Sequence, residues 1–155
     1  MAAIDSDQYG STKRVPAPAI GGVAHMLVGT IEVSSAQSAS DTINFFTAPK
    51  GFTPIWGWLY GDDIDTGTET FDMDIGTSSD ADAYGNLGVL TGDAVTGIKP
   101  ETGISMPLGG TLLTAKPAEL TADTDIIGTV NAAANAGGTG TLTLIMLGVY
   151  KDPRF

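Results

Sequence analysis

The chain has 155 residues, the length of one domain that can bury a hydrophobic core. Its formal net charge of −11 disfavours direct contact with nucleic acid or with an anionic membrane surface, because both require Lys and Arg. The absence of cysteine excludes disulfides and thiolate zinc sites, and it fits synthesis in a reducing cytoplasm.

The first 22 residues show no periodicity and contain Pro16, Pro18 and a Gly21-Gly22 pair. They predict an N-terminal arm ahead of a domain at 23–155. The arm could be disordered alone, or it could extend over a neighbouring subunit at about 3.3 Å per residue. The residues that we expect to make such a contact are Lys13, Arg14, Val15 and Pro16.

Short β-prone runs separated by turn residues follow the arm, and no segment has the periodicity of a long helix. A short helical turn could begin in 77–83, 87–95 reads as a loop or short helix, and 97–110 has no assignment. The strands are expected at 25–33, 41–47, 54–60, 70–76, 111–115, 124–130 and 140–150. This spacing predicts an all-β fold, an antiparallel β-sandwich or jelly roll of seven to eight strands.

Two of these strands have informative patterns. In 70–76, Phe71, Met73 and Ile75 alternate with Asp72 and Asp74, which predicts a strand with one buried face and one solvated face. The second half of 140–150 is apolar on both faces, which predicts a central strand.

The aromatic residues Trp56, Trp58 and Tyr60 alternate along one strand, so they share a face, with Ile55 and Leu59 expected on the other. Such a stripe could be core, a subunit interface or a platform that stacks on sugars. Because both faces of the strand are apolar, the pattern favours core or interface over sugar binding.

Half of the chain's 18 acidic residues lie between Lys50 and Lys99, with no basic residue among them. This acidic belt comprises Asp62, Asp63, Asp65, Glu69, Asp72, Asp74, Asp80, Asp82 and Asp93. Asp62, Asp63 and Asp65 are weak candidates for calcium ligands, because they lack EF-hand spacing and a closing Glu. Asp in turns and on a solvated strand explains the belt without a metal, so we expect no metal or cofactor.

Catalytic motifs are missing from the sequence. The single histidine, His25, lies in an expected strand, and no Gly-x-Ser-x-Gly elbow or phosphate loop accompanies it. Asp72 and Asp74 could form a glycosidase pair, but no second motif supports that chemistry. The sequence therefore predicts a protein that is not an enzyme.

Several turn and strand signatures lie in 41–150. They are Asp41-Thr42-Ile43 with Pro49-Lys50-Gly51, Asp62-Asp63-Ile64-Asp65-Thr66-Gly67-Thr68, Phe71-Asp72-Met73-Asp74-Ile75-Gly76, and Gly138-Thr139-Gly140-Thr141-Leu142. Together these signatures resemble those of small bacteriophage virion proteins encoded near the major capsid protein.

The resemblance implies a capsid decoration (cement) protein on the virion exterior. Its implied partners are the major capsid protein and other copies of itself, in a homo-oligomer such as a trimer. Another virion part, such as a tail, fibre or spike component, or a glycan-binding β-sandwich, is the alternative, and a hydrolase using the acidic belt is the third possibility.

Overall fold

The computed structural model describes residues 24–90, 104–114 and 118–150, which form eight strands and one short helix. The elements are β1 (Ala24–Val33), β2 (Thr42–Ala48), β3 (Phe52–Gly61), β4 (Asp72–Gly76), β5 (Gly85–Val89), β6 (Ile104–Pro107), α1 (Thr111–Thr114), β7 (Thr124–Ala132) and β8 (Gly140–Tyr150).

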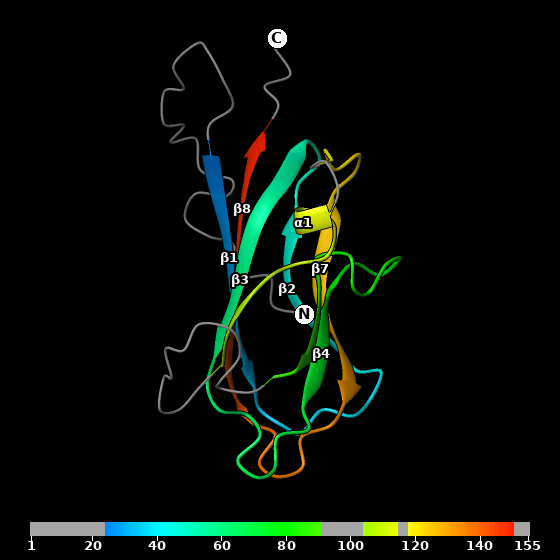
Figure 1. Ribbon diagram of the computed structural model, residues 1–155. Coiled ribbons are helices and arrows are strands. Elements are labelled where there is room, and N and C mark those ends of the chain that lie inside the picture. The colour runs from blue at the N-terminus through cyan, green and yellow to red at the C-terminus, as the bar shows by residue number, and fades with distance from the viewer. Residues whose placement is uncertain (1–23, 91–103, 115–117, 151–155) are drawn as a thin grey trace.

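The strands form two antiparallel sheets, with the order β1-β8-β3-β6 in the first and β2-β7-β4-β5 in the second. Figure 1 shows the two layers facing each other, with β1, β8 and β3 in one and β2, β7 and β4 in the other. Consecutive strands alternate between the layers except for β4 and β5, which pair within the second sheet, and this is the strand order of a jelly roll. The predicted all-β sandwich is therefore confirmed, and β8 is a central strand.

The core lies between the sheets and follows the period-2 alternation of the strands. In β8, Leu142, Leu144 and Met146 are fully buried, while the residues between them are half-buried. Across the sandwich these residues face side chains of the second sheet. The largest of the fully buried side chains in the core are Phe45, Phe52, Phe71, Leu59, Ile64 and Met73.

The prediction of a strand at 111–115 is wrong, because Thr111–Thr114 forms the helix α1. Gly110 adopts a φ of 58°, a left-handed conformation that turns the chain. The Thr111 amide and hydroxyl then both donate to the Ala83 carbonyl, and the Thr114 hydroxyl donates to the Gly110 carbonyl. These local bonds override the β propensity of Thr and Leu.

Two strands lie where the sequence pattern is weakest. β5 overlaps the start of the stretch 87–95, which was expected to be a loop or short helix, and β6 lies in the unassigned stretch 97–110. Residues 77–84 form hydrogen-bonded turns rather than a helix, with the Thr77 amide donating to the Asp80 carbonyl at 2.8 Å. Both strands are short and pair at sheet edges, so they carry little alternation to detect.

Candidate functional site

The predicted aromatic stripe lies on the outer surface of the first sheet. Trp56, Trp58 and Tyr60 project from β3 in one row, with ring centroids 5.5 Å apart for the first pair and 5.9 Å for the second. Trp56 and Tyr60 expose 41% and 42% of their surface. Trp58 is half-buried, and its indole Nε1 donates to the Ser105 hydroxyl of β6 at 3.0 Å.

The stripe is not part of the core of this chain, and one side-chain direction was predicted wrongly. Leu59 points inward as expected, but Ile55 is 42% exposed. The cause is a register shift between Pro54 and Trp56 in the pairing of β3 with β8. A bulge of this kind adds a residue to one strand and interrupts the alternation of faces.

The register of the sheet continues the stripe across the two neighbouring strands. The outward residues of β8 lie directly beside the aromatic residues, and those of β1 lie on the other side of β8, where Met26 is 47% exposed. The three rows, each running from β3 across β8 to β1, are Trp56–Leu147–Met26, Trp58–Ile145–Val28 and Tyr60–Thr143–Thr30. We call these residues the apolar face.

The sheet that carries the apolar face is almost without charge. Glu32 is the only Asp, Glu, Lys or Arg in β1, β3, β6 and β8, although the whole chain has a net charge of −11. Glu32 pairs with Thr141 at one end of the face. A partly exposed apolar surface that lacks charge is typical of a surface that becomes covered by a partner.

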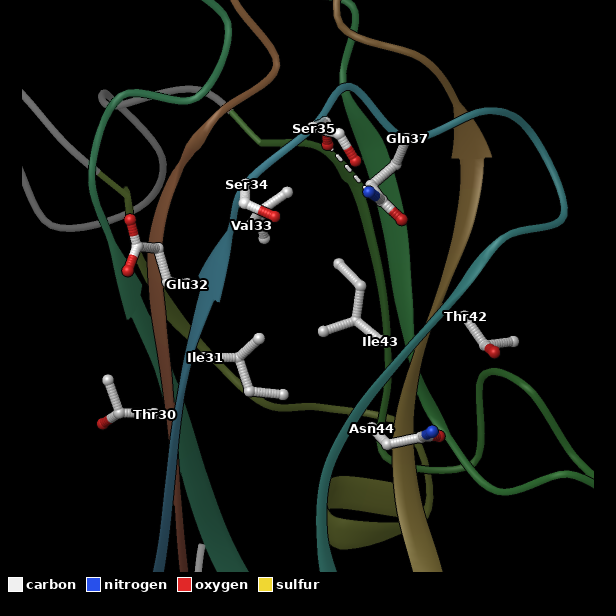
Figure 2. Close-up of a pocket in the computed structure, with 10 residues that line it drawn as sticks. All are labelled: Thr30, Ile31, Glu32, Val33, Ser34, Ser35, Gln37, Thr42, Ile43 and Asn44. Carbon is white, nitrogen blue, oxygen red and sulfur yellow. Dashed lines mark hydrogen bonds between the residues drawn. The ribbon is translucent and has the colours of Figure 1, made fainter. Parts of the chain in front are cut away.

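A cleft of about 390 Å³ lies between β1 and β2, the edge strands of the two sheets on one side of the sandwich. Figure 2 shows Ile31 of β1 and Ile43 of β2 pointing toward each other across it, while Thr30 and Glu32 point away. Nearby, Gly29 allows β1 to approach β2 closely, because a Cβ at this position would overlap the Phe45 carbonyl of β2.

The acidic belt has a buried member with a structural role. Asp65 is 2% exposed, and its carboxylate accepts bonds from the backbone amides of Thr70, Phe71, Asn135 and Ala136 and from the Thr70 hydroxyl, at 2.7–3.2 Å. Burial raises the pKa of the Asp65 carboxyl, but these hydrogen bonds outweigh it and hold the pKa well below its usual range. Asp65 therefore ties the chain ahead of β4 to the chain ahead of β8.

The three candidate calcium ligands do not form a metal site. Asp65 is held by protein donors, and Asp62 accepts a bond from the Thr141 amide at 2.8 Å. Asp63 is exposed. Across 24–90, 104–114 and 118–150, no group of three or more His, Asp or Glu side chains is arranged to hold a metal ion.

The predicted solvated face of strand 70–76 is wrong for one of its two carboxylates. Asp72 is half-buried and accepts a bond from the Asn131 amide at 3.0 Å, but Asp74 is only 8% exposed. Among the described atoms, Oδ1 of Asp74 has no hydrogen-bond partner. The cause is the central position of β4, between β7 and β5, where Thr129 and Asn86 flank Asp74.

Other predicted residues have simpler outcomes. Lys13, Arg14, Val15, Pro16 and Asp93 lie outside the described residues. His25 packs edge-on against the Tyr150 ring at 4.7 Å, and burial lowers its pKa. In the part of the chain that the structure describes, no helix has the length and apolarity needed to cross a bilayer.

Comparison with solved structures relates this fold to phage capsids. The chain is similar to a chain of the capsid asymmetric unit of cyanophage Pam1, with a TM-score of 0.68, 20% identity, and coverage of 97% of this chain and 100% of that one. For the capsid of Ralstonia phage GP4 the TM-score is 0.56, with 23% identity and 97% and 99% coverage.

A third similar chain comes from the acid-stable capsid of Helicobacter pylori bacteriophage KHP30, with a TM-score of 0.56, 14% identity, and 84% and 90% coverage. No protein-family model and no curated protein matches the sequence. At these identities the comparisons establish a shared fold, found in three phage capsids.

Sequence reasoning identified the stripe but missed its extent and the cleft. Val28, Ile145 and Leu147 look like core residues in a sequence, because each lies in a strand that is apolar on both faces. The order of strands in the sheet, which brings β1 and β3 to the two sides of β8, is what joins them into one surface.

Proposed function

We propose that this chain is a structural protein of a bacteriophage virion, a decoration (cement) protein that binds the exterior of the capsid and bridges neighbouring major capsid subunits. The observation that carries the proposal is the apolar face: it is exposed, nearly uncharged, and borne by a fold shared with chains of three phage capsids. No catalytic role is needed to explain any of its residues.

The apolar face is suited to attachment. Trp56, at 41% exposure, leaves roughly 100 Å² in water, and burying that area is worth about 2.5 kcal/mol. Aromatic anchors of this type commonly supply most of the affinity of an interface. A subunit that binds the assembled shell more tightly than free coat protein stabilises the shell by mass action.

The partners follow from this role. They are the major capsid protein and other copies of this chain, in a homo-oligomer such as a trimer, because capsid shells offer local symmetry axes. Residues 1–22, with Lys13, Arg14, Val15 and Pro16, form an arm that contacts a neighbouring subunit. The protein is made in the host bacterial cytoplasm and acts on the capsid exterior.

Binding to purified capsids that lack this protein tests the proposal. The full chain should bind them and raise the temperature at which they release their genome. Trp56→Ser with Tyr60→Ser should weaken attachment at least tenfold. Leu113→Ser is the matched control, because Leu113 is a 76% exposed apolar residue on α1, outside the apolar face. If the wild-type chain binds and the variant with Trp56→Ser and Tyr60→Ser binds equally well, the apolar face has no role in attachment.

Deletion of residues 1–20 tests the arm separately. The truncated chain should keep the melting temperature of the domain, because every core residue of the described strands is retained, but it should attach to capsids more weakly. Full binding by the truncated chain would exclude the arm from attachment while leaving the apolar face in place.

The exposed rings support a second candidate, a tail, fibre or spike component, or another module, that binds host glycans. Trp56 and Trp58 lie side by side with an interplanar angle of 40°, and exposed indole rings stack on sugars. Binding to a glycan array that is lost in Trp56→Ala or Trp58→Ala, together with no binding to capsids, would favour this candidate.

A further inference from the structure

The outer edge of β1 is a long strand edge with no strand partner among the described residues. β1 spans Ala24–Val33 and pairs only with β8, and β2 similarly pairs only with β7. At the opposite side of the sandwich the edges are short, four residues in β6 and five in β5. Long, uncharged edges are templates for pairing with another strand, and proteins normally cover them.

The surroundings of this edge would bury an added strand on both faces. On the inner side lies the cleft of about 390 Å³, where Ile31 and Ile43 face each other (Figure 2). On the outer side lie Met26 and Val28 of the apolar face. Because side chains alternate between the faces of a strand, the occupant must be apolar at every position, not at every second one.

One segment of this chain has that composition and lies outside the described residues. Residues 15–20 read Val-Pro-Ala-Pro-Ala-Ile, which is apolar throughout. In an extended strand, the N–H groups of alternate residues point to the same edge. Pro16 and Pro18 therefore leave two N–H groups missing from one edge, while the edge formed by Val15, Ala17 and Ala19 is complete.

Such a strand can pair on one side only. Its complete edge could continue the ladder of β1, and its proline edge would end the sheet and prevent further addition. An antiparallel orientation would also bring Lys13 and Arg14 to the end of β1 that carries Glu32, the only acidic residue of that strand. The charges are therefore complementary in this orientation.

The prolines disfavour pairing of this segment with β1 of the same chain. A tight turn at Gly21-Gly22 would pair Ile20 with Val23 and direct the N–H positions of residues 18 and 16 toward β1. Both positions are proline, so both hydrogen bonds would be absent. A segment from another copy can choose the register that presents Val15, Ala17 and Ala19 instead.

We propose that residues 15–20 of one copy of this chain add to β1 of a second copy as an antiparallel strand, closing the cleft between β1 and β2. This deepens the proposed function by identifying the neighbour that the arm contacts. It is testable in solution without capsids, so its failure and a failure to bind capsids are separate results.

Thiol crosslinking tests which copy receives the segment, because the natural chain contains no cysteine. Chains carrying only Ala17→Cys are mixed with chains carrying only Val28→Cys, and a short bismaleimide is added. The linkage between positions 17 and 28, identified by mass spectrometry, must then join two chains. Leu113→Cys replaces Val28→Cys in the matched control, because Leu113 is exposed on α1.

We expect the linkage between positions 17 and 28 to exceed that to position 113 at least tenfold. A double variant, Ala17→Cys with Val28→Cys, is crosslinked in parallel at low concentration. A linkage found only within that double variant would show that the segment pairs with its own β1 and would overturn the proposal. Equal linkage to positions 28 and 113 would overturn it as well.

Proline substitution tests the one-sided strand. Ala17→Pro removes an N–H from the complete edge, so the dissociation constant between copies, measured by sedimentation equilibrium, should rise at least tenfold. Pro18→Ala is the matched control and should leave that constant within about twofold. Equal effects of the two changes would contradict pairing through Val15, Ala17 and Ala19.

Discussion

The two sheets of this jelly roll have similar inner faces and opposite outer faces. The first sheet presents Trp56, Trp58, Tyr60, Leu147 and Met26 outward. The corresponding outward positions of the second sheet are mostly polar, with Ile127 opposite Asn44 and Val89 opposite Asp72 as the apolar exceptions. The polar ones are Thr42, Asn44, Thr129, Asn131, Asp72 and Asn86. A sandwich needs only its inner faces to be apolar, because the outer faces meet water.

A polar outer face is therefore sufficient for folding. The apolar residues on the outer surface of the first sheet are not required for the sandwich to fold. Retaining two tryptophans and a tyrosine on the surface promotes association between molecules, which a chain with a net charge of −11 otherwise resists. The acidic residues lie almost entirely outside the strands of the first sheet. This difference is what the proposed attachment to a capsid requires, with one face available for contact and the other meeting solvent.

The largest effect on stability is expected when the hydrogen bonds of Asp65, which connect the two crossovers between the sheets, are removed. Asp65 lies in the crossover from β3 to β4 and accepts bonds from Asn135 and Ala136 in the crossover from β7 to β8. Asp65→Asn places an amide NH₂ against backbone donors, so it should lower the free energy of unfolding by on the order of 3 kcal/mol. Urea unfolding measures it, with Asp63→Asn, an exposed neighbour, as the control. The two sheets should unfold together in one transition. Equal free energies of unfolding for Asp65→Asn and Asp63→Asn would contradict the anchoring role of Asp65.

The same carboxylate gives the fold a pH dependence of known sign. The pKa of Asp65 is lowered in the folded chain relative to about 3.9 in an unfolded one. Its contribution is therefore fully present above about pH 5 and is lost as the pH falls below about 4 toward the folded pKa. Urea unfolding between pH 3 and pH 7 should show the wild type losing more stability than Asp65→Asn. Parallel curves for the two proteins would mean that Asp65 contributes nothing to acid sensitivity.

Matched changes on the two outer faces sharpen the comparison itself. Trp56→Ser should reduce capsid affinity by about 2 kcal/mol, which corresponds to roughly 30-fold. Asn86→Ser, an exposed change on the second sheet, should alter it less than about threefold. The change on the second sheet should alter the free energy of unfolding by less than about 0.5 kcal/mol, because that side chain is exposed. Trp56→Ser also loses the ring contact with Trp58, so capsid binding is measured at a temperature at which both variants are folded. Equal losses of affinity would mean that the two faces do not differ in function.

The sequence predicted the fold class well because the strands of the core alternate strongly. Strand 140–150, with Leu142, Leu144 and Met146 at every second position, was expected within the residues that β8 occupies. The weak elements were predicted less well. β5 and β6 are edge strands of five and four residues, and the Gly110 turn converts the next β-prone run into α1.

The site was predicted only in part, because its extent depends on which strands become neighbours. The stripe of Trp56, Trp58 and Tyr60 is visible as alternation within one strand. Met26 lies 30 residues away in the sequence and reaches the same surface only because β8 pairs with both β1 and β3. Periodicity also assigned Asp74 to solvent, since it reports which face a residue occupies but not what covers that face.

Asp74 gives the smallest effect and tests the polar outer face. Its Oδ1 atom is buried without a hydrogen-bond partner among the described residues, and burial of a carboxylate without full pairing opposes folding. Asp74→Asn keeps the shape and removes the charge, so it should leave the free energy of unfolding unchanged or raise it by about 1 kcal/mol, as measured by urea unfolding at pH 7. Asp72→Asn is the control, because Asp72 already accepts a bond from Asn131. A loss of more than 1 kcal/mol in Asp74→Asn would show that the charge itself is required, and the polar face would then have a role beyond meeting solvent.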